Sequence, residues 1–500
     1  MKKKKLIIIG AGLAGMSAGS YLQMNGFDTE TYEMGTKAGG LCTSWKRNDY
    51  LIDGCIHFMS GISPNEVSYP FWNNLIDMKS IDFVLSDSHA VVEDENKNRI
   101  SFYSNIDKLE VELLTKAPED KKYIKEFVGL IRKFIKVQLP VEKPFEVMNL
   151  NDKLKAAYQM MPYLYSINKY LKISNYEYAA KFKNPLLKYA LETIFVNYMP
   201  LFYSIMPLVW RHKKDTGYPK GGAIYISNLL QEKYENLGGK MHFNTSVDRI
   251  LTEKNRVKGI KLNTGQEIPC DIVVSASDGR STIFELLQGK YKDKNIVEKY
   301  DSGVFEPIDK TLYVAIGVNK DFSGEPRKLY FPLKTPIVVD ALTTLDHLEV
   351  SHYCDDPASA PEGKTVITLM PDAKDWEYWN SLRKTDREKY ENEKTRIANE
   401  IIEALDAQFG DIKVNLEMID VSTPATYIRY TNNWTGGQIS WKATRETFGK
   451  PTTWKIKGLS DFYMTGQWAG TSGGLNNVVM MGNHLAQIIC KDEGKAFQTN

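Results

Sequence analysis

The chain has 500 residues, too many for one ordinary hydrophobic core, so two or three packed units are expected. Hydrophobic residues make up 42% and charged residues 25%, the balance of a globular protein rather than a disordered or fibrous one. The net charge is +2, and no dense stripe of Lys and Arg interleaved with aromatic residues occurs. These features exclude a nucleic-acid partner and leave small molecules or a membrane surface.

Cysteine usage and the N-terminal residues indicate a cytoplasmic protein. The five cysteines are scattered, with no CxxC pair and no histidine at metal-ligand spacing, so we expect reduced thiols and no metal site. Met1–Ile9 has the charged and apolar parts of a secretion signal, but its cleavage would destroy the motif described next. The apolar run Thr193–Trp210 contains two prolines and is no ordinary membrane span. We expect a cytoplasmic chain, in solution or bound peripherally to the cytoplasmic face of the membrane.

The first forty residues predict a strand, a glycine-rich turn, a helix and a second strand. Lys5–Ile9 is a short apolar run typical of a buried parallel strand. Leu13–Asn25 has helical spacing and ends at Gly26, and Phe27–Glu33 is the second strand. The sequence Gly-Ala-Gly-Leu-Ala-Gly at residues 10–15 joins the first strand to the helix. This is the context that a dinucleotide-binding fingerprint requires.

Each part of the fingerprint has a physical role. Gly10 makes the tight turn, Gly12 lets the backbone approach a pyrophosphate, and Gly15 lets the helix and strand pack closely. Leu13 and Ala14 place N–H groups at the helix start, where the helix dipole favours phosphate oxygens.

An acidic residue and a second glycine turn help to distinguish among NAD, NADP and FAD. Glu33 stands 18 residues after Gly15, where a carboxylate accepts hydrogen bonds from an adenosine ribose and repels a 2′-phosphate, which disfavours NADP. Gly39 and Gly40 form another turn soon afterwards. A plain NAD dehydrogenase has no use for this second turn, whereas a cofactor that extends past its pyrophosphate to a flavin does. The second turn therefore favours FAD, although taken alone it is more typical of an ordinary loop.

A helical segment rich in aromatic residues follows. Phe83–Tyr103 alternates like an antiparallel strand pair with its turn at residues 95–98, and Lys108–Trp210 is helical. Residues 156–210 hold 9 of the 28 tyrosines, together with several methionines. Amphipathic rings and flexible methionines suit a lipid tunnel or a membrane-contact surface, and they suit an aromatic-rich helical core equally well.

The remaining pattern predicts an α/β fold. It consists of a helix from Gly222 through Tyr234, short strands between Lys240 and Ala276, strands Leu312–Val318 and Thr365–Leu369, a helix Lys384–Phe409, a strand Phe462–Gly466 and a helix Leu475–Lys491. We expect a discontinuous two-dinucleotide, Rossmann-like FAD domain at residues 1–80, 215–299 and 431–500. Inserted into it are an α+β substrate domain (81–107 and 300–430) and a helical, aromatic-rich subdomain (108–214).

Motifs along nearly the whole chain resemble the phytoene desaturase, carotenoid isomerase and retinol saturase group of flavoproteins, within the amine-oxidase-like superfamily. They are the fingerprint, the Gly-Gly turn, Asp53–His57, Tyr218–Gly222, Val273–Ala276, Asp356–Pro357 with Ala360–Gly363, Arg429–Tyr430 and Gly466–Gly482.

The resemblance implies that the Val247 backbone meets the adenine and that residues 473–477 lie beneath the flavin. A helix beginning at Leu475 would point its positive end at the flavin edge where negative charge develops on reduction. The expected cofactor-binding residues are Gly10, Gly12, Leu13, Ala14, Gly15, Glu33, Met34, Gly39, Gly40, Leu41, His57, Val247, Gly466, Gly473, Gly474, Leu475, Asn476 and Asn477.

The sequence departs from the family pattern in two places. The loop Trp468–Gly474 lacks the usual proline and third glycine, and Asn476–Asn477 replaces a pair of small residues. These departures put the substrate in doubt more than FAD binding. No catalytic acid or base is assigned. Four side chains could stand near a flavin, and His57 is preferred because its segment follows the Gly-Gly turn; the others are His352, Tyr203 and Tyr353.

The sequence predicts an FAD-dependent oxidoreductase that exchanges hydride between flavin and a C–C bond of an apolar isoprenoid or polyene lipid, as a desaturase or a saturase. Alternatives are a reduced-flavin cis–trans isomerase of a polyene, an amine oxidase, and a lipid-binding flavoprotein without turnover. No second GxGxxG follows residue 15, so we expect no built-in NAD(P)H domain. Electrons would then pass to or from an external quinone, oxygen or reductase.

Overall fold

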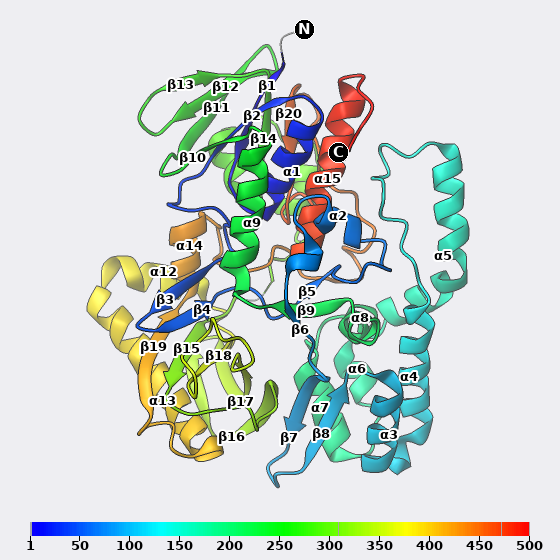
Figure 1. Cartoon of the computed structure of the whole chain (residues 1–500), viewed down its shortest axis with the longest axis vertical. Coiled ribbons are helices and arrows are strands. Elements are labelled where there is room, and N and C mark those ends of the chain that lie inside the picture. Colours follow the sequence, from blue (N-terminus) through cyan, green and yellow to red (C-terminus); the bar gives the residue numbers. More distant parts are fainter. Residues whose placement is uncertain (1–2, 309, 472, 500) are drawn as a thin grey trace.

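Parallel strands from three separate parts of the chain form the central sheet of one half of the molecule (upper half of Figure 1). The computed structural model describes residues 3–308, 310–471 and 473–499. The strand order is β10-β2-β1-β14-β20, and every neighbouring pair is parallel. The strands are β1 (Lys5–Ile9), β2 (Asp28–Tyr32), β10 (Lys240–His242), β14 (Ile272–Ser275) and β20 (Phe462–Met464). This arrangement confirms the discontinuous α/β fold.

Small residues bring three helices close together beside this sheet. α1 (Leu13–Met24) packs against both α9 (Gly222–Asn236) and α15 (Leu475–Asp492). A Cβ on Gly19 would lie 2.5 Å from the Tyr234 ring of α9, and one on Gly482 would lie 2.5 Å from the Ser17 hydroxyl. The close approach buries α1 on almost all sides. An antiparallel sheet of β11 (Val247–Glu253), β12 (Arg256–Leu262) and β13 (Glu267–Pro269) lies beside this half.

The other half is built on a mixed sheet in the order β19-β15-β18-β17-β16-β7-β8. All its neighbours are antiparallel except β16 and β7. The strands are β7 (Ser88–Glu93), β8 (Arg99–Tyr103), β15 (Tyr313–Val318), β16 (Lys328–Asp340), β17 (Thr343–His352), β18 (Thr365–Leu369) and β19 (Leu416–Ser422). The strands at 88–103 thus complete a sheet whose other members come from residues 313–422.

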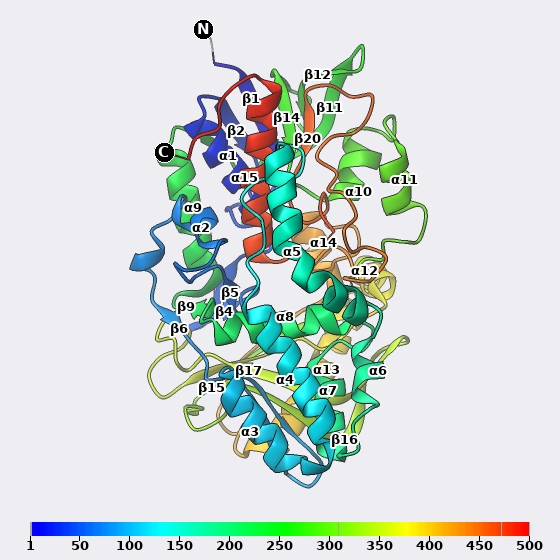
Figure 2. The same ribbon diagram turned by 90° about the vertical axis from the view of Figure 1, so that its right-hand side faces the viewer.

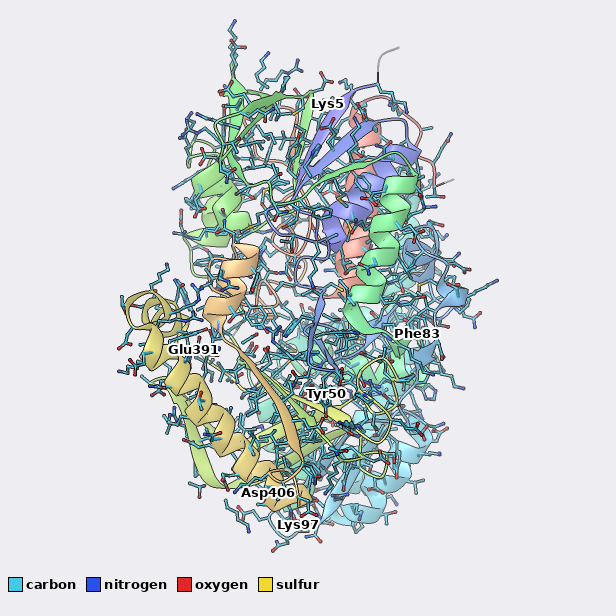
Figure 3. The ribbon with its side chains drawn as sticks, turned by 60° about the vertical axis from the view of Figure 1, so that its left-hand side comes forward. Lys5, Tyr50, Phe83, Lys97, Glu391 and Asp406 are labelled. Carbon is cyan, nitrogen blue, oxygen red and sulfur yellow. The ribbon has the colours of Figure 1, made fainter. Side chains whose placement is uncertain are left out.

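Helices and a hairpin cover this second sheet. α12 (Trp376–Thr385) and α13 (Arg387–Phe409) bury apolar side chains against it, and α14 (Pro424–Thr431) follows β19. The hairpin of β3 (Ser44–Arg47) and β4 (Tyr50–Asp53) packs Tyr50 and Ile52 against β15 and β18. Tyr50 therefore lies where the upper and lower halves meet, whereas Glu391 and Asp406 mark α13, which descends along the lower left side (Figure 3).

Six helices make up the remaining part, in the order α3 (Ile106–Lys116), α4 (Lys121–Ile135), α5 (Leu150–Leu171), α6 (Asn175–Ala179), α7 (Pro185–Ile194) and α8 (Leu201–His212). Five of them share one apolar core with β7 and β8, and only the C-terminal end of α5 reaches it. The first part of α5 stands away from the body at the right of Figure 1, and Figure 2 shows it in front of α15. Among the described residues, no helix is long and apolar enough to cross a membrane.

Short elements complete the chain. A small sheet of β5 (Met59–Ser60), β9 (Thr216–Pro219) and β6 (Phe83–Val84) joins the two halves. The other short helices are α2 (Tyr69–Asn73), η1 (Met78–Ser80), η2 (Pro118–Asp120), α10 (Gly279–Ser281), η3 (Thr282–Leu286) and α11 (Lys294–Tyr300).

Three sequence-based expectations need correction. Phe83 and Val84 leave the predicted 83–103 strand pair and pair instead with β9, whereas the turn at residues 95–98 is found as expected. The helix predicted from Lys384 begins at Arg387, because α12 ends at Thr385 and Asp386 caps α13 with its side chain. The long hairpin of β16 and β17 was not expected at all.

Candidate functional site

The turn between β1 and α1 leaves open space above one glycine only. Gly10 has a φ of +100°, and a Cβ on Gly15 would lie 2.1 Å from the Gly10 carbonyl oxygen, so both positions need glycine for the turn itself. A Cβ on Gly12 would meet nothing within 4 Å. Gly12 is the N-cap of α1, with no side-chain cap and no acidic residue in the first turn. The N–H groups that begin at Leu13 and Ala14 therefore lie beside open space at an uncapped helix start, an arrangement suited to an anion.

Glu33 is fixed at the end of β2 by backbone donors. Its Oε2 accepts a hydrogen bond from the Ala11 N–H at 2.8 Å, and its Oε1 accepts one from the Gly35 N–H at 2.7 Å. Each carboxylate oxygen keeps a second lone pair for a ligand hydroxyl. The Thr245 N–H donates to the Glu33 carbonyl at 2.8 Å, which brings Val247, at the start of β11, to the same edge as the half-exposed Met34.

The second glycine turn lies across the first. The Gly39 N–H donates to the Ala11 carbonyl at 2.9 Å, and a Cβ on Gly40 would lie 3.3 Å from the Gly12 Cα. Leu41 follows and packs towards the β3–β4 hairpin. The structure therefore brings both glycine turns together, as the sequence predicts.

The segment 466–474, near the C-terminus, approaches the first turn of α1. A Cβ on Gly466 would lie 3.2 Å from the Cβ of Ala14, so this turn touches the first turn of α1. Gly473 contacts Ile439, and Gly474 has a φ of +106° with nothing within 4 Å of a Cβ. Ser472 of this loop lies outside the described residues.

α15 starts at Leu475 without a side-chain cap. The Asn476 Oδ1 is buried without a partner among the described residues, and a Cβ on Gly61 would lie 2.7 Å from it. Asn477 occupies the same first turn. The helix start thus offers an uncapped positive end and the unpartnered amide oxygen of Asn476.

A buried aspartate positions His57. The Asp53 carboxylate accepts hydrogen bonds from the N–H groups of Cys55, Ile56 and Ala223, at 2.9, 2.9 and 2.8 Å. Ala223 lies in the first turn of α9, so these bonds tie the 53–57 segment to that helix. Burial raises the pKa of Asp53 to about 6. The segment after it presents His57 to a cavity at the junction of the two halves.

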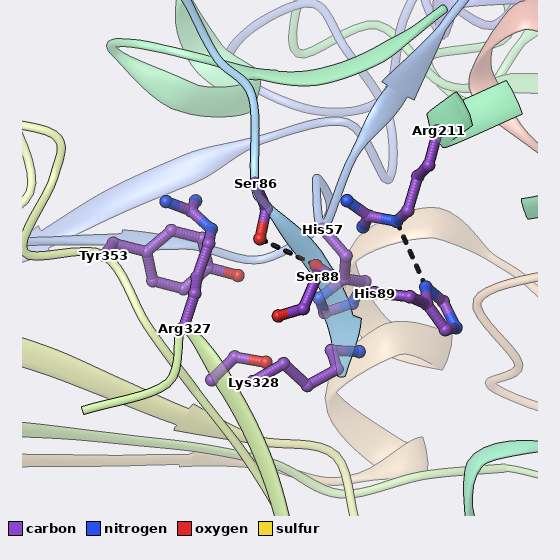
Figure 4. Close-up of a pocket in the computed structure, with 9 residues that line it drawn as sticks. His57, Ser86, Ser88, His89, Arg211, Arg327, Lys328 and Tyr353 are labelled. Atoms are coloured by element: carbon purple, nitrogen blue, oxygen red, sulfur yellow. Dashed lines mark hydrogen bonds between the residues drawn. The ribbon is translucent and has the colours of Figure 1, made fainter. Parts of the chain in front are cut away.

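This cavity has a volume of about 20 Å³, room for one water molecule, and its walls come from distant parts of the chain. His57 faces Arg327 and Lys328 at the start of β16 and Tyr353 after β17 (Figure 4). Arg211 of α8 enters from another side, and its Nε donates to the His89 Nδ1 at 3.1 Å. Cations and histidines therefore surround a small enclosed space.

The charges around the cavity suppress protonation of its histidines. Burial, and then the positive charge of Lys328, lower the pKa of His57 to about 4. Burial and Arg211 hold the pKa of His89 well below its usual value. Burial and Arg327 lower the pKa of Arg211 to about 10, so Arg211 stays charged at neutral pH while both histidines are neutral.

The four candidate acid–base residues separate into two groups. His57 and Tyr353 line the cavity. His352 does not, because its ring lies near the Glu325 carbonyl at 3.2 Å and the Cys354 Sγ at 3.1 Å. Tyr203 packs against Phe202 and Phe448 in an aromatic cluster away from it.

Known proteins resemble the chain at low identity but along most of its length. Residues 8–75 match the family described as an NAD(P)-binding Rossmann-like domain. Prolycopene isomerase 1 of an Oncidium hybrid cultivar is 24% identical, over 98% of this chain and 84% of its own. A 4,4′-diapophytoene desaturase of a Methylomonas species is 21% identical, over 99% and 97%. These relatives confirm the resemblance to the carotenoid desaturase and isomerase group. The chain is an FAD-type oxidoreductase.

Solved structures confirm the fold of this oxidoreductase. A variant of putrescine oxidase aligns with a TM-score of 0.63 over 98% of this chain and 99% of its own, at 10% identity. At that identity the likeness shows the shared flavoprotein fold alone.

The residues present in the oxidoreductase fit FAD. The open space above Gly12 would admit a pyrophosphate, the free Glu33 lone pairs would accept hydrogen bonds from ribose hydroxyls, and Val247 lies at the edge where the adenine would then be. The uncapped start of α15, with the unpartnered Asn476 amide oxygen, suits the polar edge of a flavin. We propose on this basis that these positions, together with Gly39 and Gly40, hold the cofactor.

Several residues of the cavity were missed by sequence reasoning. Arg211, Arg327, Lys328 and His89 belong to no motif. The sequence held one signal: Arg211 follows the uncharged run 201–210, and a charge next to a buried apolar helix needs a function or a partner.

Proposed function

We propose that the chain binds FAD and exchanges hydride between the flavin and a C–C bond of an apolar isoprenoid or polyene lipid, as a desaturase or a saturase. The observation that carries the proposal is the start of α15, an uncapped helix end that follows two glycines. Its positive end stabilises negative charge on a reduced flavin. When bound, FAD supplies the two-electron exchange with the lipid. The Oncidium isomerase and the Methylomonas desaturase support a carotenoid-like substrate class.

In this proposal the chain's own residues bind and orient the substrate and exclude water. No side chain is required to transfer a proton. Of the two candidates that line the cavity, His57 and Tyr353, His57 is preferred; its lowered pKa of about 4 keeps the ring neutral and makes it a weak base. We also propose the domain limits given above, with the substrate lying between the FAD domain and the mixed sheet.

An anaerobic assay tests this function against its nearest alternative. The holoenzyme is mixed with a polyene lipid under argon, and flavin absorption and lipid mass are followed together. A change of two hydrogens in the lipid, with matching flavin reduction or oxidation, is expected. An unchanged lipid mass with altered double-bond geometry, dependent on pre-reduced FAD, would favour a cis–trans isomerase instead.

Amine oxidation is the second alternative, and the cavity argues against it. The putrescine oxidase likeness covers the fold only. An amine substrate is a cation, whereas Arg211, Arg327 and Lys328 line the space beside His57. Like charges at such a site disfavour amine binding. Hydrogen peroxide release on a panel of amines would contradict our proposal. A flavin that stays oxidised with every lipid and reductant would favour a non-catalytic lipid-binding protein.

We further propose that α5 docks on the cytoplasmic face of a membrane, where an apolar substrate dissolves. Leu150, Leu154, Tyr158, Met161 and Tyr165 recur along one face of the helix, and each is at least 59% exposed. A row of exposed apolar and amphipathic side chains on a helix that stands off the body is typical of interfacial binding. Electrons would reach or leave the flavin through an external quinone, oxygen or a reductase.

A further inference from the structure

The cavity beside His57 carries more positive than negative charge. Arg327 pairs with Asp355, and Lys328 pairs with Glu349. Arg211 pairs with no carboxylate among the described residues. Its guanidinium instead lies 5.4 Å from the centre of the Phe58 ring and donates to His89. A charge in a partly buried position without a counter-ion is costly, so this arrangement favours an anion from outside the chain.

Unused hydrogen-bonding atoms converge on the same space. Within the part of the chain that the structure describes, the Tyr353 hydroxyl, the Arg327 Nη2 and both ring nitrogens of His57 are buried without partners. The tyrosine, the arginine and one nitrogen of a neutral histidine are donors. A buried donor without an acceptor is rare in a folded protein unless a ligand or water completes it. The missing partner is therefore rich in acceptor oxygens.

The cavity lies close enough to the proposed flavin position for one substrate to reach both. Gly61 contacts Asn476 at the start of α15 and is four residues from His57. Four residues span at most about 14 Å, the length of a lipid chain of roughly a dozen carbons. A head group held here would leave carbon atoms farther along the chain beside the flavin.

We propose that this cavity binds the carboxylate of the substrate, so that the substrate is an acidic lipid with an apolar chain rather than an uncharged hydrocarbon. The inference rests on the proposed function, which it makes more specific. Arg211 supplies the compensating charge, and the Tyr353 hydroxyl and the Arg327 Nη2 donate to the two carboxylate oxygens. Because the free volume of about 20 Å³ holds only one water molecule, the side chains that line the cavity must move apart to admit a carboxylate, and the larger phosphate group would require a larger movement.

Calorimetric titration of the holoenzyme with three lipids of one chain tests the proposal: farnesoate, farnesol and farnesyl phosphate. Because charge-assisted hydrogen bonds are strong, we expect farnesoate to bind at least ~10-fold more tightly than farnesol. Equal affinity for acid and alcohol, tighter binding of the phosphate, or binding of none of the three would overturn the proposal.

Two variants test whether the preference for farnesoate arises in this cavity. Arg211→Met is expected to abolish the preference for the acid. Tyr353→Phe removes a hydroxyl that lacks a partner, so the melting temperature should hold or rise while farnesoate binding weakens by ~5-fold or more. Tyr300→Phe is the matched control, because the Tyr300 hydroxyl is also buried without a partner among the described residues but lies outside the cavity. Unchanged farnesoate affinity in Tyr353→Phe, or an equal loss in Tyr300→Phe, would contradict the assignment.

Measurements of lipid binding and of flavin redox change distinguish the carboxylate site from the proposed hydride-transfer function. An acid preference without any flavin redox change would keep the head-group site and refute the hydride-transfer function. Flavin reduction by farnesol or an uncharged polyene, without a preference for the acid, would keep the function and refute the carboxylate site.

Discussion

Gly12 and Gly15 stand one helical turn apart, yet their surroundings differ completely. Gly15 meets the Gly10 carbonyl, whereas Gly12 meets open space. Gly12 has a φ of −69°, which any residue adopts. Glycine at position 12 is therefore explained by a ligand that comes close to the backbone rather than by the fold.

Gly12→Ala is therefore expected to preserve the apoprotein's melting temperature while weakening FAD binding by ~10-fold or more, because the added methyl group fills the pyrophosphate space. Gly15→Ala should instead lower stability by about 1–3 kcal/mol through the clash with Gly10. Thermal melts and FAD titration of both apoproteins measure the difference. Wild-type FAD affinity in Gly12→Ala would refute the assignment.

His484 makes stability depend on pH in a predictable direction. It is 7% exposed on α15, and its Nε2 lies 2.7 Å from the Val141 carbonyl. Burial lowers the pKa of His484 to about 4, against an unfolded value near 6.5. Between these values the unfolded chain binds more protons, so stability falls as the pH drops through this window.

Replacing this histidine should therefore flatten the acid response. The wild type is expected to lose about 2 kcal/mol more than His484→Gln between pH 7 and pH 5, because glutamine keeps a donor for Val141 but does not titrate. Denaturant melts at both pH values measure the two slopes. Parallel slopes would show that His484 does not contribute.

At the scale of single elements, the first ten residues of α5, 150–159, contribute no side chain to the apolar core of the helical part. The buried residues of α5 all lie at its end, from Ser166 to Leu171. Leu154 and Tyr158 are 60% and 75% exposed. The aromatic-rich segment thus divides: its first part forms the exposed face, and the rest fills a helical core.

Changing two residues of this face tests the docking proposal. Leu154→Glu with Tyr158→Glu should reduce binding to vesicles of phosphatidylcholine and phosphatidylglycerol by ~10-fold or more, with little change in melting temperature. Val414→Glu is the matched control, since Val414 is 81% exposed but lies before β19. Equal vesicle binding by all three proteins would exclude α5 as the docking surface.

Elements with one clear periodic pattern were predictable, and those with a mixed pattern were not. β1, α1, β2 and α15 were found close to their predicted bounds, because buried parallel strands and glycine-bounded helices have strong local signals. β16 was missed because Pro332 and Pro336 interrupt its run, and proline normally argues against a strand. The cavity was missed with it, since Arg327 and Lys328 reach His57 only through the register of that strand.

At the scale of the whole molecule, the segments that form the parallel sheet, which we propose to hold FAD, are separated along the chain by the segments of the mixed sheet and the helical part. The sequence predicted that the glycine turns near residues 12, 40 and 474 bind one cofactor, and the structure brings the turns at 12 and 40 together. Their roles follow from backbone geometry, which glycine spacing encodes directly. The substrate cavity depends on packing between halves, which no single segment encodes.

The same architecture predicts how electrons enter. The sequence has one dinucleotide fingerprint, so we expect no separate NADPH site beside the flavin. Stopped-flow mixing of the holoenzyme with NADPH alone is expected to leave the flavin oxidised. Rapid bleaching of flavin absorption would require a second nucleotide site and refute this expectation.

We propose that the β1–α1 turn and the start of α15 together hold one FAD. The most direct measurement is the flavin content of folded, purified chain, extracted and quantified against protein after incubation with FAD. One FAD per chain is predicted for the wild type, and markedly less for Gly12→Ala at the same FAD concentration. Folded, monodisperse wild-type protein that stays colourless and retains no flavin would contradict the account.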